Sequence, residues 1–497
     1  MAAPTIPNGE TQFFPVIYEG NGGGQRVGNF VPFTDNGTIA NSLIFNDDDS
    51  PYMRRTPSGA GNRKTFTISF WVKRCQLGVL QVICTQGADH NNATVISFDT
   101  SNRFKFSHND SGSATYTVTT NRTFEDTSKF YHLLASVDTT QSTASDRVKL
   151  YVDGDLVTSF ASSSYPSQDF DLDFNSTGTI AVSGQIPSGT LFPFDGYLTE
   201  INLVDGSALT PDTFGLTDTS TGRWIPKALT GITYGTNGFR LQFGTSSALG
   251  DDTSGNTNDF GTVSGLVAGD QTTDSPTQNH ATLQGTGGTL TEGNLTLVTG
   301  SSEFAHHNAT FKPKSGKYYA EFTCNAMGRS EVGVASTTKL PYSANNVRLP
   351  ATDDGSLAGY MWYGYSGEIL TDSGSGNAGT YATYTTNDII SIALDLDNHT
   401  VQFFKNNSSV GTFGLPNSNY TFCMGDGATG YGGGWTANFG QKSFTYTPPT
   451  GYKKLNQDNA PETAKGITGL AWMKDRDSGS LNHALYDSSR GANKLLY

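Results

Sequence analysis

Two glycine-rich stretches, GYMWYGYSG and GDGATGYGGGW, hold the side chains best suited to bind a ligand. Aromatic rings stack on the faces of sugars and anchor protein interfaces, and tyrosine and tryptophan do so at a low entropic cost. The same rings also fill cores, and glycine within a strand often marks only a bulge. Ligand binding and core packing therefore both stay open for the four candidate residues, Tyr363, Tyr365, Tyr431 and Trp435.

A second group of candidates consists of carboxylates in one polar loop. Asp251, Asp252 and Asp259 lie there beside Asn256 and Asn258, and together they offer hard oxygen ligands of the kind that Ca²⁺ prefers. The spacing is not that of an EF-hand, and Asp and Asn are also ordinary turn formers. A Ca²⁺ site and a set of turn residues stay open as alternatives, and we expect no other cofactor.

The other reactive residues do not form a catalytic set. His306 and His307 are adjacent, and adjacent residues of a strand point to opposite faces, so we expect a solvated pair and not a chelate. A Gly-x-Ser-x-Gly nucleophile requires a strand-to-helix elbow, and no helical pattern is evident. The four Cys form no CxxC pair, which disfavours zinc and favours buried free thiols. We therefore expect no enzyme activity.

The composition predicts an all-β protein. The 497 residues include 58 Gly, 30 Phe and 22 Tyr, and only 15% of them are charged. Helical proteins favour Ala, Leu, Glu and Lys, whereas sheets with many turns favour the Thr, Ser, Gly, Asn and aromatic residues used here. A chain of this length holds two or three domains with full-sized cores.

Charge and hydropathy exclude two classes of partner. A formal net charge of −14 repels a phosphate backbone, and no block of Lys and Arg offsets it, so nucleic acid is not an expected partner. No apolar run reaches the length of a bilayer span, and the first residues lack the features of a secretory signal. We expect a protein that is made in a cytoplasm and does not insert into a membrane.

Residues 388–413, DIISIALDLDNHTVQFFKNNSSVGTF, carry the clearest strand pattern of the second half. Apolar residues occupy every second position from Ile390 to Leu396, which places them on one face of an extended chain. An Asp-Asn pair then supplies turn chemistry, and a β-branched and aromatic run follows. The stretch therefore predicts a β-meander.

Alternating runs also mark the first half. One of them intersperses the apolar Phe66, Ile68, Phe70 and Val72 with Thr67, Ser69, Trp71 and Lys73. This alternation predicts a strand with one buried and one wet face. Further along, Asp153-Gly154 joins two apolar-alternating runs, which is the strongest short signal for a hairpin. Phe239, Leu241 and Phe243 predict one more strand in an otherwise turn-rich segment.

The second half resembles a SPRY domain. Three pieces occur in that family's order, namely GKYYAEF at 316–322, the meander at 388–413 and ANFG at 437–440. The resemblance covers roughly residues 290 to 455. It implies a bent antiparallel β-sandwich that binds partners through loops at one rim.

The first half resembles a LamG or concanavalin-A-like jelly roll. The pieces FTISFWVKR, FYHLLASVD, VKLYVDGDLV and FDGYL occur in that family's order across about 40 to 215. The resemblance implies a second β-sandwich, of a family that often holds Ca²⁺ at a loop rim. Glucanases of this general fold carry their acids as Glu-x-Asp-x-x-Glu on one strand. Residues 200–205, EINLVD, have another spacing, so the two facing carboxyl groups of a glycosidase are not expected here.

The order of modules resembles virion and tail-fibre proteins of tailed bacteriophages. Besides the two sandwiches, the pieces GRWIPKA, DDTSGNTNDF and DSPTQN carry this resemblance, which covers almost the whole chain. The predicted division of the chain is an N-terminal arm at 1–37, a LamG-like jelly roll with a C-terminal strand segment at 38–270, a linker at 271–289, a SPRY-like sandwich at 290–456 and a C-terminal extension at 457–497.

The resemblance implies a structural and adhesive virion protein. Its partners would be other virion proteins and host-surface carbohydrate or envelope, and a homo-oligomer, a trimer by analogy, would multiply weak sites into avidity. A head decoration protein without a receptor role is the alternative. A polysaccharide depolymerase is a third hypothesis. The release of reducing ends from host polysaccharide would identify that activity.

Overall fold

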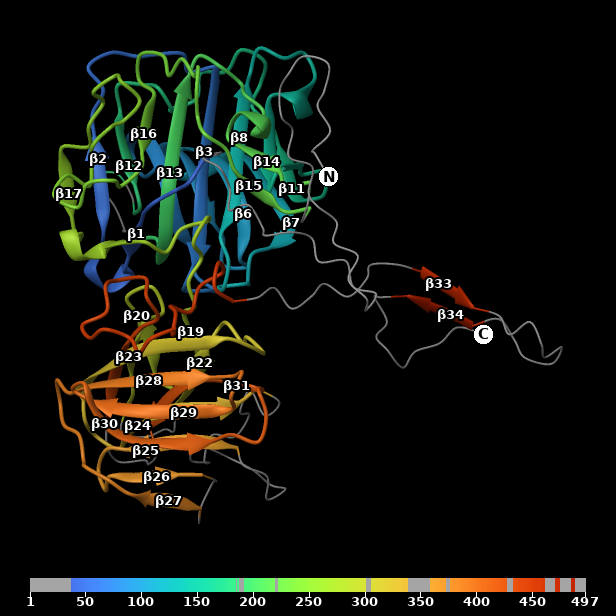
Figure 1. The fold of residues 1–497 in the computed structure, drawn as a ribbon. Helices are drawn as coiled ribbons and strands as arrows, with labels where there is room; N and C mark the ends of the chain where they lie inside the picture. The colour runs from blue at the N-terminus through green and yellow to red at the C-terminus, as the bar shows by residue number, and fades with distance from the viewer. Residues whose placement is uncertain are drawn as a thin grey trace, which may run out of the picture.

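The chain folds into two β-sandwiches that lie one above the other (Figure 1). The computed structural model describes residues 37–184, 186, 192–219, 222–300, 305–337, 358–371, 376–426 and 432–460, together with the backbone of 470–473 and 484–487. Within these residues the only helices are short 3₁₀ turns, and the all-β prediction is confirmed. The turns are η1 (Asp47–Asp49), η2 (Ala144–Asp146), η3 (Pro211–Thr213) and η4 (Ala268–Asp270). No helix in the described part is long and apolar enough to span a bilayer.

The first sandwich pairs two eight-stranded antiparallel sheets. In order, the first sheet contains β10 (Asp155–Leu156), β9 (Val148–Val152), β8 (Tyr131–Asp138), β3 (Thr65–Arg74), β13 (Gly196–Asp205), β1 (Ser42–Phe45) and β18 (Gln271–Thr272), and β16 (Phe239–Leu241) pairs with β13. The second sheet contains β11 (Phe160–Ser164), β7 (Ser113–Thr123), β6 (Arg103–Asp110), β5 (Asn92–Phe98), β4 (Gln81–Asp89), β12 (Thr179–Val182), β2 (Tyr52–Arg55) and β17 (Thr262–Ser264).

The predicted strand and hairpin signals of the first half are confirmed. The apolar set that begins at Phe66 lies in the core between the sheets. Asp153 and Gly154 form the tight turn from β9 to β10 with φ values of 51° and 87°. Two left-handed residues in succession match the right-handed twist of the flanking strands, which is why Asp-Gly is favoured there.

The wet face predicted for β3 is wrong. Ser69 is 1% exposed, Trp71 5% and Lys73 0%. A short hairpin, β14 (Gly215–Thr217) with β15 (Trp224–Pro226), and the chain around it cover one part of this outer face. The segment that joins the two sandwiches covers the end that carries Lys73. Both covering segments lie far from β3 in the sequence, so the local alternation of apolar and polar residues does not predict them.

The second sandwich pairs two seven-stranded sheets. The first contains, in order, β19 (Leu283–Thr286), β22 (Ala305–Ala309), β31 (Tyr420–Asp426), β24 (Ser330–Ser336), β25 (Gly359–Tyr363), β26 (Glu368–Leu370) and β27 (Asn377–Thr380). The second contains β20 (Thr289–Thr291), β21 (Thr296–Val298), β32 (Gly434–Asn438), β23 (Lys317–Ala326), β28 (Ile389–Asp395), β29 (Thr400–Lys405) and β30 (Ser408–Gly414). The predicted meander is the run β28–β29–β30, and it is confirmed. Farther on, β33 (Leu470–Met473) pairs with β34 (Ala484–Asp487).

The two sandwiches meet through a closed, specific junction. The Lys73 ammonium is fully buried and lies 2.9 Å from each of three acceptors, the carboxylate of Asp274, the amide oxygen of Asn279 and the carbonyl of His280. The Tyr197 hydroxyl donates to the carbonyl of Gly293 at 2.7 Å. Part of the segment expected as a linker is thus packed structure, and its start, β18, extends the first sheet.

Candidate functional site

The structure brings two of the predicted aromatic residues together at the edge of the second sandwich. Tyr363 ends β25 and Tyr365 lies in the turn that follows, with their ring centroids 6.2 Å apart. Tyr365 is 53% exposed, whereas Tyr363 is 4% exposed. The guanidinium carbon of Arg329 lies 3.7 Å from the centroid of the Tyr365 ring. Its Nη1 donates to the Tyr363 hydroxyl at 2.8 Å. We call Arg329, Tyr363 and Tyr365 the rim cluster.

The rim cluster combines an oriented cation with an exposed ring. The hydrogen bond to Tyr363 orients the guanidinium over the face of Tyr365, where the ring quadrupole attracts it. The other face and edges of the Tyr365 ring supply apolar area, and its hydroxyl supplies a donor and an acceptor. Such a surface suits a hydroxyl-rich or planar ligand group.

The other two aromatic candidates do not join this cluster. Trp435 is fully buried on β32, and its ring packs 5.3 Å from that of Tyr384 inside the second sandwich. Core packing, one of the two alternatives, therefore holds for Trp435. Tyr431 lies outside the described residues.

The Asp candidates for Ca²⁺ form a hydrogen-bonded loop. Both carboxylate oxygens of Asp252 accept hydrogen bonds, which come from the backbone N–H groups of Arg240, Ser254 and Asn258 and from the Ser254 hydroxyl, each at 2.8 Å. Asp259 accepts from the Asp252 N–H at 2.8 Å, and Asp251 is exposed. In the part of the chain that the structure describes, no group of three or more His, Cys, Asp or Glu residues is arranged to hold a metal. Asp252 and Asp259 thus close the turn, and the Ca²⁺ site stays a prediction.

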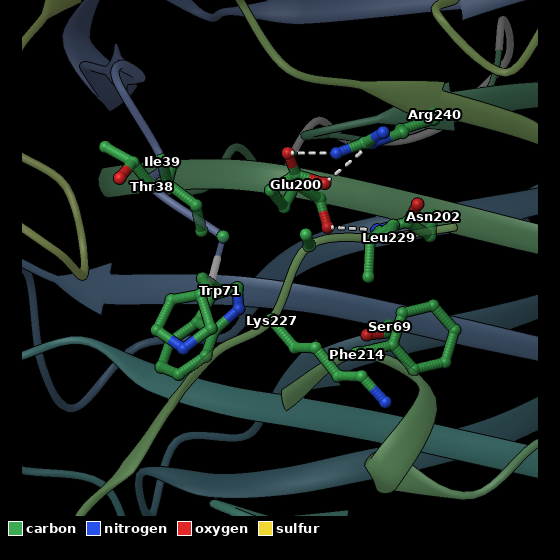
Figure 2. A pocket seen from close by; sticks show the side chains of 13 residues that line it. Thr38, Ile39, Ser69, Trp71, Glu200, Asn202, Phe214, Lys227, Leu229 and Arg240 are labelled. Atoms are coloured by element: carbon green, nitrogen blue, oxygen red, sulfur yellow. Dashed lines mark hydrogen bonds and ion pairs between the residues drawn. The ribbon is translucent and has the colours of Figure 1, made fainter. Parts of the chain in front are cut away.

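A hollow of about 310 Å³ lies on the outer face of the first sheet, between that face and the residues after β15 (Figure 2). Glu200 of β13 and Arg240 of β16 line it and form a two-point ion pair, Nε to Oε2 at 2.9 Å and Nη2 to Oε1 at 2.8 Å. Gln242 donates to the same Oε1 at 2.8 Å. Glu200 sits in a β-bulge with φ at 48°, a conformation that non-glycine residues rarely adopt. The bulge turns its carboxylate outward and leaves Ile201 in the core.

The described lining of this hollow carries one carboxylate. Glu200 is the one carboxylate among its lining residues, and Arg240 and Gln242 occupy both of its oxygens. Retaining and inverting glycosidases place two carboxyl groups on either side of the bond that breaks. The described lining offers one such group.

A buried Ser–His contact beside the hollow has the wrong protonation for nucleophilic catalysis. The Oγ of Ser69 lies 2.8 Å from Nε2 of His132. Trp224 Nε1–H donates to the His132 Nδ1 at 3.1 Å, so Nδ1 carries no proton. Burial lowers the pKa of His132 to about 3, so the ring is neutral at pH 7 and its proton is on Nε2. His132 therefore donates to Ser69 and does not act as its base.

The His306–His307 pair is buried, which corrects the expectation of a solvated pair. His306 is 5% exposed and His307 is 4% exposed, because β22 lies inside its sheet between β19 and β31. Burial lowers the pKa of His307 to about 4. Whether a strand such as β22 lies at the edge or in the interior of its sheet depends on its pairing with strands that are distant in the sequence. The local sequence did not predict that pairing.

Comparison with known families identifies both domains. Residues 47–213 match the concanavalin A-like lectin/glucanases superfamily, and residues 317–424 match the SPRY domain. Both domain resemblances found in the sequence are thereby confirmed. The comparison with curated proteins found no match.

Several solved structures are similar to parts of the chain. The SPRY domain of human HERC1 is 21% identical, covers 30% of this chain and 91% of its own, and has a TM-score of 0.25. A SAP-like pentraxin from Limulus polyphemus is 14% identical over 35% of this chain and 79% of its own, with a TM-score of 0.25. A putative carbohydrate binding protein from Bacteroides ovatus is 13% identical over 35% and 45%, with a TM-score of 0.25.

Proposed function

We propose that this protein is a non-enzymatic, glycan-binding adhesion protein of a tailed-phage virion, placed in or on the tail. The domain families support a binding role, since both are sandwich domains of the lectin-like or partner-binding kind. The virion setting rests on the order of modules in the sequence. In the virion, a symmetric homo-oligomer presents several copies of one weak site. The linked sites bind a cell surface with higher avidity than any single copy does.

The observation that carries the binding role is the rim cluster. The Arg329 guanidinium lies 3.7 Å from the centroid of the exposed Tyr365 ring and is held there by its hydrogen bond to Tyr363, so little order is lost when a ligand packs on the cluster. The ring packs on the apolar face of a sugar, and the guanidinium donates to its hydroxyl oxygens.

Glycan-array binding of the intact chain and of Tyr365→Ala tests the role of the rim cluster. We expect the substitution to weaken glycan binding about 3- to 10-fold per site, which is the range that one aromatic contact supplies. Tyr365→Phe keeps the ring and should retain most of the binding.

Tyr52→Ala is the matched control, because Arg54 stacks on Tyr52 in the first sandwich at 3.9 Å. That variant should bind the array as the parent does. Equal binding by the parent and Tyr365→Ala, or an equal loss in both alanine variants, would remove the rim cluster from the binding site.

A further inference from the structure

A second hollow, also of about 310 Å³, lies where the two sandwiches meet. Trp71 and Trp224 line it from the first sandwich, and Trp71 also borders the hollow of Figure 2. Asn279 lines it from the segment that joins the sandwiches, and Gln457 from the chain that follows the second one. We call it the junction hollow. Neither sandwich alone contains its full lining.

The aromatic side of the junction hollow is rigid. The imidazole of His132 contacts both tryptophans, with ring centroids 4.9 Å from Trp71 and 5.8 Å from Trp224. A Cβ on Gly154 or on Gly215 would come within 2.4 or 2.5 Å of the Trp224 indole, so only glycine fits against it. With the Nε1–H bond to His132, these contacts fix the indole before any ligand arrives, which lowers the entropic cost of binding.

The polar side of the junction hollow carries balanced charge. Asp153 and Asp155 line it on the β9–β10 turn, and Lys129 and Arg223 line it as cations, so the formal charges cancel. Arg223 donates to Oε1 of Gln457 at 3.0 Å, which joins the first sandwich to the chain that follows the second one. Asp153 accepts from the backbone N–H of His132 at 2.9 Å. Asp155 is exposed at the mouth.

We propose that the junction hollow binds a neutral pyranose sugar, whose ring packs on the accessible part of the half-buried Trp224 while its hydroxyl groups bond to Asp155 and to the Arg223–Gln457 pair. Aromatic faces with a few convergent polar groups are what a sugar's apolar ring faces and hydroxyl edges require. The volume is at the lower end of the roughly 300–1,000 Å³ of small-molecule sites, which suits one or two sugar units. Charge balance favours a neutral sugar over a uronic acid or an amino sugar.

This site is separate from the rim cluster, and the proposal does not depend on it. The test uses the full chain and a panel of methyl glycosides of glucose, galactose and mannose, with glucuronate and glucosamine as charged probes. Binding is followed by saturation-transfer NMR and by quenching of tryptophan fluorescence. We expect at least one neutral glycoside to bind with a Kd in the millimolar range, and the charged probes to bind at least 5-fold more weakly.

Variants on two different parts of the lining, the first sandwich and the chain after the second one, locate the binding. Asp155→Ala and Gln457→Ala should each weaken the binding of the neutral glycoside about 5-fold or more, because each removes a hydrogen-bond partner of the sugar hydroxyl groups. Asp212→Ala, an exposed aspartate that does not line the junction hollow, should leave the Kd unchanged, as should Tyr365→Ala. The proposal is overturned if no neutral glycoside binds at 50 mM, if a charged probe binds more tightly, or if neither Asp155→Ala nor Gln457→Ala alters a Kd that Tyr365→Ala does alter.

Discussion

At the scale of single residues, burial decides the chemistry of the carboxylates. Asp195 is 4% exposed, and its Oδ1 is buried without a hydrogen-bond partner among the residues that the structure describes. Desolvation by burial raises the pKa of this carboxyl well above its usual range, and repulsion from Asp47 and Asp48 raises it further. The folded protein therefore holds the Asp195 proton to higher pH than the unfolded chain does.

This raised pKa predicts a pH dependence of stability. Between the unfolded pKa of about 4 and the higher folded pKa, the native state binds more protons, so the contribution of Asp195 falls as pH rises. Asp195→Asn should then increase the free energy of unfolding at pH 7, by about 1.4 kcal/mol for each unit of raised pKa, and should change it little at pH 4. Urea unfolding at both pH values measures this. A loss of stability at pH 7 would show that the ionised carboxylate has a stabilising partner.

At the scale of elements, the bulge in the central strand β13 carries a side chain that contacts the short neighbouring strand β16. The Glu200 carboxylate reaches the guanidinium of Arg240, which pairs with Asn202 in the strand register, and the side chains of Glu200 and Arg240 are 10% and 19% exposed. A positive φ at a glutamate is a local cost that the surrounding contacts offset. The pair therefore holds β16 in register on β13.

Removal of one partner of this pair should destabilise the first sandwich. Glu200→Ala leaves the Arg240 guanidinium partly buried and without its carboxylate, so we expect a loss of about 3 kcal/mol in the free energy of unfolding. The control Glu125→Ala changes an exposed glutamate and should stay within about 0.5 kcal/mol of the parent. Denaturant unfolding compares them, and similar values for the two variants would show that the pair contributes little.

At the scale of the whole molecule, the Lys73–Asp274 pair couples the sandwiches. Both side chains are fully buried, and the pair has Asn279 and a backbone carbonyl as further partners for the ammonium. A buried pair is not by itself a source of stability, but removal of one member leaves an uncompensated charge. The relative placement of the two domains therefore depends on this contact.

Lys73→Met should lower the free energy of unfolding by about 3–5 kcal/mol. The double variant Lys73→Met with Asp274→Leu should recover a large part of that loss. Lys64→Met is the matched control, because Lys64 forms a surface pair with Asp169 that should be worth less than about 1 kcal/mol. Unfolding followed by tryptophan fluorescence reports on Trp71 and Trp224 beside the junction. If the double variant is as unstable as Lys73→Met, the loss of stability comes from altered packing and not from the unpaired charge of Asp274.

Much of the fold was readable from local sequence. The strand that begins near Phe66 with its buried apolar face, the Asp153-Gly154 turn and the meander after Asp388 were each predicted from short stretches of sequence, and each is confirmed. The candidate sites were only partly readable. Tyr363 and Tyr365 are two positions apart in the sequence and close in space, but Arg329, which contacts both, lies in the turn between β23 and β24. A lone arginine gave no signal of that role.

The sequence by itself determined the fold class, because side-chain periodicity and turn chemistry act over a few residues. Only the tertiary structure decided which faces are covered. Lys73 and Trp71 have the pattern of a wet face, yet both are buried by chain that lies up to several hundred residues later. The junction hollow has the same origin, since its lining combines the first sandwich with the joining segment and with Gln457, which follows the second sandwich.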